Sequence, residues 1–321
     1  MKSETEKKPK GHFAREHTVV YVVMLAGAIL RIRQYLTGRS LWLDEAMLAL
    51  NIVNRSFFEL FRPLDYDQGA PIGFLMVEKV FNVFLGRNEY ALRLFPLILG
   101  LLSLWTFYLV LKRFLHDTPF VIAVALFAFN PALIYYSSEL KQYSMDVFAA
   151  ITLLLLAIHY FEKPSPKRLG IIAMAGVLAL WFSHPALFLL AGIGLTLLLV
   201  HVQKRGLQNL TPILGVGLLW LANVGFLYFI SLGSLRNNAY MRQYWQDAFA
   251  PMPPWRDLPW YWDTLHFNAD THFAVTLAPW LLFVLLLAGW IYLLRQNREM
   301  GMIIGFMLFF TLLASSLKLY P

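Results

Sequence analysis

The fold of this chain follows from the stretch TVVYVVMLAGAILRIRQYLTGRSLWLDEA at residues 18–46. It opens with an apolar run close to the length of about 20 residues that crosses a bilayer. It ends with Asp44 and Glu45, two acids placed where the chain leaves the apolar layer. Acids at this depth indicate either an active site or the start of an amphipathic helix, whose positive end suits carboxylates. Trp42 fits an aromatic residue at the membrane interface.

The composition of the whole chain predicts a polytopic membrane protein. Hydrophobic residues make up 59% of the 321 residues and charged residues only 14%, against about half and a quarter in soluble domains. The net charge of +8 is therefore expected in cytoplasmic loops, and nucleic acid is not expected as a partner. The chain has no cysteine, which excludes disulfides, a thiolate nucleophile and cysteine-ligated zinc.

Apolar periodicity predicts an all-α protein with about nine transmembrane helices. The expected spans are residues 18–36, 90–111, 119–136, 143–161, 169–183, 185–201, 211–232, 273–294 and 300–317. Residues 1–17 form a basic tail, and residues 18–321 form one transmembrane domain. Because no small-residue cleavage site follows the first span, we expect a retained anchor and not a signal peptide.

The orientation depends on whether the ambiguous apolar run 71–85 spans the membrane. If it does not, the tail and all short basic loops share one side; these loops contain Lys112, Arg113, Lys163, Lys167, Arg168, Lys204, Arg205, Arg295 and Arg298. Positive residues favour the cytoplasmic side, so we expect a cytoplasmic N-terminus. Residues 37–89 then form a long outer loop with interfacial helices at 45–60 and 71–85. Residues 233–272, rich in Trp and Pro, form a second outer loop.

A second polar constellation, IYYSSELKQYSMD, occupies residues 134–146 between two predicted spans. It offers Glu139 as an acid, Lys141 as a cation and three tyrosines at membrane depth. The alternative interpretation is a helix cap with a Glu–Lys pair within the loop, which contributes little if it is exposed. The predicted orientation places this loop on the same face as Asp44, which favours a shared site.

Four motifs in this order resemble the GT-C membrane glycosyltransferases of the protein O-mannosyltransferase and aminoarabinose-transferase type, in particular their bacterial branch. The motifs are WLDEA at 42–46, DYDQGAPI at 65–72, YALRL at 90–94 and YYSSELKQYSMD at 135–146. The resemblance covers residues 18–200 best. Such enzymes usually continue with further spans, so this chain is expected to be C-terminally short.

The resemblance implies a monosaccharide donor on a polyprenyl phosphate and an inverting transfer to an acceptor hydroxyl on the outer face. The residues agree, because no glycine-rich, phosphate-cradling loop of a nucleotide-binding domain is present, so no nucleotide is expected. By resemblance Asp44 is the catalytic base, and a partly desolvated carboxylate suits that role. Glu139 matches the second catalytic acid, which positions the acceptor or binds a metal.

Five further residues are expected to bind substrate. Lys141 is the expected phosphate contact, as a point charge where relatives often carry Arg. Arg93 either contacts the phosphate or is a snorkelling residue at the interface. Tyr143 either bonds the phosphate or belongs to the aromatic belt. Glu45 is either a ligand or an acid at the start of a helix. Asp67 belongs to the first outer loop, where Gln68-Gly69-Ala70 replace the His, Glu or Lys of some relatives.

A divalent cation, Mg²⁺ or Mn²⁺, is an optional cofactor on Asp44 and Glu139, since oxygen ligands suit these ions. The expected location is the bacterial inner membrane, with lipid, polysaccharide or protein as acceptor. Two alternatives stay open. One is a transporter or flippase, although transporters place ionisable groups near the midplane and here the acids gather at one edge. The other is an inactive, truncated relative.

Overall fold

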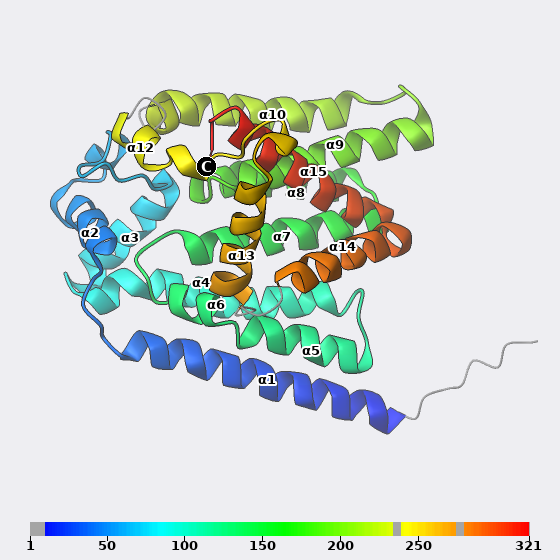
Figure 1. Ribbon diagram of the computed structural model, residues 1–321, viewed down its shortest axis with the longest axis horizontal. Coiled ribbons are helices and arrows are strands. Elements are labelled where there is room, and N and C mark those ends of the chain that lie inside the picture. Colours follow the sequence, from blue (N-terminus) through cyan, green and yellow to red (C-terminus); the bar gives the residue numbers. More distant parts are fainter. Residues whose placement is uncertain (1–9, 234–238, 274–278, 321) are drawn as a thin grey trace, which may run out of the picture.

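The computed structural model describes residues 10–233, 239–273 and 279–320, and these ranges contain helices and no strand (Figure 1). Most of the predicted tail 1–17, residues 234–238 of the second outer loop and residues 274–278 of the predicted span 273–294 lie outside the described residues. The long helices are α1 (Lys10–Leu36), α4 (Glu89–Leu111), α7 (Tyr143–Glu162), α8 (Pro166–Phe182), α9 (Ala186–Arg205), α10 (Thr211–Leu227), α14 (Pro279–Gln296) and α15 (Arg298–Ser316).

Seven helical segments of the described part are long and apolar enough to cross a membrane. They are His17–Leu36, Glu89–Leu111, Tyr143–Glu162, Ala186–Arg205, Thr211–Ser231, Pro279–Gln296 and Arg298–Ser316. Large apolar side chains such as Leu25, Leu221 and Phe229 are exposed on them, as expected for surfaces that face lipid. The protein is therefore an all-α, multi-pass membrane protein. The predicted number of nine spans is not confirmed.

Two of the nine predicted spans differ from the other seven. The segment predicted as 169–183 is α8, which has 17 residues and, at 1.5 Å per residue, falls slightly short of the hydrocarbon layer of about 30 Å. The segment predicted as 119–136 is not one helix. It divides into α5 (Asp117–Ala128) and α6 (Pro131–Tyr136).

The break between α5 and α6 has a local cause and a partner across the bundle. Asn130 caps α6 by accepting a hydrogen bond from the amide of Leu133 at 2.9 Å, and Pro131 takes the first helical position. The carbonyl groups of Phe127 and Ala128 accept hydrogen bonds from the buried guanidinium of Arg31 in α1, at 3.3 and 2.8 Å. Arg31 thus satisfies backbone groups that would be costly to leave free at membrane depth.

The long helices run side by side, roughly along the long axis of the molecule (Figure 1). Within this bundle α4 packs on α7, α1 on α5, and α9 on α15. The connections α4–α5, α9–α10 and α14–α15, which adjoin basic residues, lie at one end, and α2 (Leu43–Asn54) and α3 (Ile72–Leu85) lie at the other. This separation is the one that the loop charges predict.

The first outer loop has its own small core at that end. Its helices α2 and α3 fall where interfacial helices 45–60 and 71–85 are expected, although α2 ends at Asn54 and a 3₁₀ turn, Glu59–Phe61, follows. Leu48, Ile52 and Phe74 are buried between α2 and α3, together with Leu140 from the loop after α6. The ammonium of Lys79 donates to the carbonyls of Ile52 and Val53 and so caps the end of α2.

The second outer loop contains α12 (Ala239–Tyr244), two 3₁₀ turns (Gln246–Ala248 and Pro254–Arg256) and α13 (Leu258–Phe273). In Figure 1, α13 crosses the direction of the long helices. Trp245, Trp255 and Trp262 are exposed on this loop. Its hydrogen bonds include one from the Trp260 indole to the carbonyl of Asp247 at 2.8 Å.

Candidate active site

Asp44 and Glu45, the two acids at the start of α2, point in different directions. Glu45 supplies the glutamate half of a capping box, because its carboxylate accepts a hydrogen bond from the amide of Trp42 at 3.0 Å. This bond turns Glu45 back into the protein, where its side chain is 0% exposed. Successive helical residues point about 100° apart, so the side chain of Asp44 turns outward and is 58% exposed. Of the two acids, Asp44 is therefore the accessible one.

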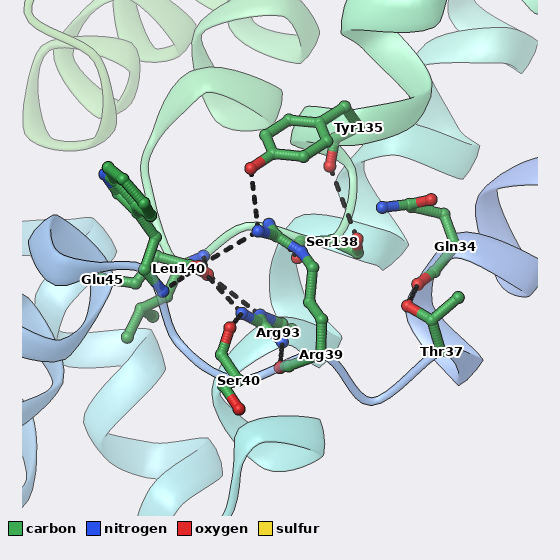
Figure 2. Close-up of polar contacts among 10 residues, drawn as sticks. Gln34, Thr37, Arg39, Ser40, Glu45, Arg93, Tyr135, Ser138 and Leu140 are labelled. Atoms are coloured by element: carbon green, nitrogen blue, oxygen red, sulfur yellow. Dashed lines mark hydrogen bonds and ion pairs between the residues drawn. The ribbon is translucent and has the colours of Figure 1, made fainter.

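Glu45 and Arg93 form the centre of a buried polar network, which we call the buried clamp (Figure 2). The Arg93 guanidinium donates two hydrogen bonds to the Glu45 carboxylate, at 2.9 and 2.8 Å. It also donates to the carbonyls of Arg39 and Ser40. The amide of Leu140 donates to Glu45 at 2.8 Å. One carboxylate thus joins the first outer loop, α4 and the segment after α6.

The charge state of Glu45 follows from these bonds. Burial alone would raise its pKa, but the hydrogen bonds from Arg93 and from the amides of Leu140 and Trp42 outweigh it and lower the pKa. Glu45 is therefore ionised at neutral pH. Its carboxylate forms an ion pair with the guanidinium of Arg93, whose side chain is only 3% exposed.

Arg39 lies at the edge of the buried clamp and was not predicted as a site residue. Its guanidinium donates to the hydroxyl of Tyr135 at 2.8 Å and to the carbonyl of Ser138 at 3.3 Å, and it stacks over the Tyr135 ring at 4.4 Å (Figure 2). Glu45 is 3.6 Å away, and the Arg39 side chain is 24% exposed. One signal in the sequence pointed to it: Arg39 is a cation in an outer loop, against the general preference for the cytoplasmic side.

Segment 137–142 brings Glu139 and Lys141 to the same end of the bundle as Asp44. Gly100 of α4 permits this approach, since a Cβ there would lie 2.7 Å from the Cβ of Ser137. The Lys141 ammonium donates to Gln68 Oε1 at 2.9 Å and lies 3.9 Å from Asp44 Oδ2. Burial lowers the pKa of Lys141, and the nearby carboxylates of Asp44, Glu139 and Glu45 offset this in part. The segments that contain Asp44 and Glu139 therefore lie at the same end of the bundle, as the loop charges predict.

Glu139 is an acid of this region whose pKa is raised. It is buried, and its Oε2 atom has no hydrogen-bond partner in the described part of the chain. Burial and the charge of Glu45 raise its pKa to about 7, against the opposing effect of Arg39, Lys141 and Arg93. A carboxyl group in this range exchanges protons near neutral pH.

The remaining expected residues lie around this group. Tyr143 begins α7, is partly exposed, and packs against Tyr136 with ring centroids 4.7 Å apart. Asp67 is exposed, and both it and Tyr66 have left-handed backbone angles, at φ of 54° and 63°. Such angles are uncommon outside glycine, and here they precede Gln68, which reaches Lys141. The sequence identifies Gln68 only as a residue that differs from the His, Glu or Lys of some relatives, and it does not predict the contact with Lys141.

The residues present do not fit a metal site well. No group of three or more His, Asp or Glu suited to a metal ion occurs in the described ranges. Between Asp44 and the segment of Glu139, the ammonium of Lys141 already supplies a positive charge. Dependence on Mg²⁺ or Mn²⁺ stays a prediction.

The family profile that this chain matches assigns the all-helical membrane bundle to a class, the GT-C-type membrane glycosyltransferases. Residues 68–229 match the profile of the dolichyl-phosphate-mannose-protein mannosyltransferase family, and since this is half of the chain, the protein belongs to that family. The matched range contains Arg93, Glu139 and Lys141, whereas Asp44 precedes it. Searches of curated proteins and of solved structures gave no match. Family membership favours the glycosyltransferase over the transporter.

Proposed function

We propose that this protein transfers a monosaccharide from a polyprenyl-phosphate donor to an acceptor hydroxyl on the outer face of a bacterial inner membrane, with inversion at the anomeric carbon. The observation that carries the proposal is the divergence of Asp44 and Glu45: one carboxylate is exposed beside Lys141, and its neighbour is held by Arg93. An exposed carboxylate can take the proton of an acceptor hydroxyl, and a nearby cation can offset the charge of a phosphate leaving group.

In this reaction the acceptor oxygen forms a bond to the anomeric carbon while the bond from that carbon to the phosphate oxygen breaks. The acceptor proton passes to Asp44, and the electron pair of the broken bond leaves with the polyprenyl phosphate. General-base assistance of this kind is typically worth about 10²–10⁴ in rate. Lys141, 3.9 Å from Asp44, supplies positive charge toward the leaving phosphate.

The other residues take supporting roles in this proposal. Glu139 positions the acceptor, with Tyr143 and Asp67 at the edge of the binding region. Glu45 and Arg93 are positioning residues, because their charged groups are buried and bonded to each other. The outer-face location rests on the basic connections at the opposite end of the bundle, since positive residues favour the cytoplasm.

The test is sugar transfer in membrane vesicles, with a panel of radiolabelled polyprenyl-phosphate monosaccharides as donors. We expect Asp44→Asn to lower transfer by about 10²–10⁴. Asp65→Asn is the matched control, because Asp65 is an exposed acid of the same loop that pairs with Arg55 at 2.9 Å. Equal activity of Asp44→Asn and wild type, or a product with retained configuration, would contradict the proposal. A chelator added to the same assay tests the metal prediction.

A further inference from the structure

We propose that Arg39 binds the phosphate group of the lipid-linked donor, as a second cationic contact next to Lys141. This inference rests on the proposed function, and it assigns a binding role to a residue of the loop between α1 and α2. The partner is a phosphate ester on a membrane lipid.

The first argument is that Arg93, the other guanidinium of this region, is buried and uses four of its five N–H groups within the protein. Its Nε and Nη2 donate to Glu45, and its Nη1 and Nη2 donate to the carbonyls of Arg39 and Ser40. Its side chain is 3% exposed. A donor phosphate would have to displace the buried carboxylate of Glu45 to reach it. The phosphate contact therefore has to come from a cation nearer the surface.

The second argument is charge. Arg39 meets Glu45 at 3.6 Å, beyond hydrogen-bond distance, and that carboxylate already accepts two hydrogen bonds from Arg93. One negative charge is thus shared by two guanidinium groups, and the closer geometry belongs to Arg93. A positive charge is left at Arg39, where a donor phosphate would neutralise it.

The third argument is that Arg39 is held in place and still accessible. The ring of Tyr135 lies under its guanidinium at 4.4 Å, and the Tyr135 hydroxyl and the Ser138 carbonyl accept its hydrogen bonds (Figure 2). A guanidinium fixed on an aromatic ring keeps a planar fork of donors that matches a phosphate. The Arg39 side chain is 24% exposed, more than Lys141 at 10%.

Arg39 and Lys141 both act on the charge of Glu139 but are held by different partners. Both cations oppose the rise in the pKa of Glu139, so both lie within electrostatic range of this carboxyl group. Lys141 is bonded to Gln68 and faces Asp44, whereas Arg39 is bonded to Tyr135 and Ser138. A donor phosphate in this region would therefore have two kinds of cation available, the point charge of Lys141 and the planar fork of Arg39.

The experiment measures binding of polyprenyl phosphate and of the uncharged polyprenol to the purified full chain in zwitterionic vesicles. The ratio of the two affinities reports phosphate recognition and does not depend on the sugar or the acceptor. We expect Arg39→Gln to lower this ratio by roughly 10- to 100-fold, the loss expected for charged hydrogen bonds. Arg39→Lys keeps the charge without the fork and should lose part of it. Arg55→Lys, in the same outer loop and paired with Asp65, should leave the ratio unchanged.

Three outcomes would overturn the inference. The first is an unchanged ratio in folded Arg39→Gln protein. The second is loss of affinity for polyprenol and its phosphate alike, which indicates a purely structural role. The third is displacement of polyprenyl phosphate by phosphatidylglycerol at equal concentration, which indicates a general site for anionic headgroups. Failure of the proposed function looks different, because wild type would then transfer no sugar whatever the affinity ratio of Arg39→Gln.

Discussion

The exposed edge of the site and the buried clamp beneath it contain the same kinds of charged group but use them differently. At the edge, Asp44 and Lys141 are 3.9 Å apart, and Asp44 is largely exposed. In the buried clamp, Glu45 and Arg93 meet at 2.8 Å and neither is accessible. A carboxylate that is open to solvent, with its cation 3.9 Å away, can receive a ligand. A pair that is closed and buried holds the chain segments in place.

The substitution with the largest expected effect on this comparison is Glu45→Gln. The change keeps the size and an acceptor oxygen but leaves the buried Arg93 guanidinium without its counter-charge. Removing one partner of a buried pair typically costs about 3–5 kcal/mol. We expect the free energy of unfolding in detergent to fall by that amount. Asp44→Asn, one residue away, should leave stability unchanged, and equal effects of the two substitutions would contradict the division into edge and clamp.

The second test uses pH and sharpens the role of the edge. The pKa of Glu139 is raised to about 7, so its neutral form prevails below that pH and its charged form above it. A negative Glu139 offsets the cations around the site, so donor binding should weaken as pH rises through about 7. We expect the KM for the donor to increase by up to about tenfold, the change that 1.4 kcal/mol produces.

Glu139→Gln checks this assignment. The amide stays neutral, so the rise in KM should be absent in this variant, whereas transfer at low pH should be largely retained. The charged groups that face Glu139 are Glu45, Arg39, Lys141 and Arg93, with Tyr136 close by. An unaltered pH profile in Glu139→Gln would assign the titration to another group.

The smallest expected effect concerns Gln68, which holds Lys141 through a hydrogen bond of 2.9 Å. Gln68→Ala frees the ammonium without removing its charge. We expect transfer to fall roughly fivefold, less than the full value of a charged hydrogen bond, since water replaces the lost partner. Gln68→Glu keeps an acceptor at this position and should retain more transfer than Gln68→Ala at equal expression. The reverse order would show that Gln68 does not act through Lys141.

Much of this arrangement could be predicted from the sequence, because it depends on hydrophobic length and loop charge. These placed Asp44 and Glu139 at the same end and identified α2 and α3 as short helices outside the spans. The break before α6 was missed, although Asn130-Pro131 is a strong helix-start signal within an apolar run. The apolar length of residues 119–136 predicts a single span, and this prediction ignores the local signal.

The roles of individual charges could not be predicted from spacing. Asp44 and Glu45 are adjacent, and only packing against Arg93 and the amide of Leu140 determines which of them is buried. The two interpretations of Arg93, a phosphate contact or a snorkelling residue, both left out a third possibility, a buried ion pair. Periodicity reports which face of a helix is apolar, but it does not report which polar groups meet across 48 residues.

The buried clamp also constrains the order in which the protein is made. Glu45 is synthesised 48 residues before Arg93 and 95 residues before Leu140. Until both have followed it through the ribosome and into the membrane, its carboxylate lacks the partners that hold it. The site therefore takes shape only after α4 and the short helix α6 have been inserted, and a nascent chain arrested before residue 139 carries Asp44 and Glu45 without their final geometry.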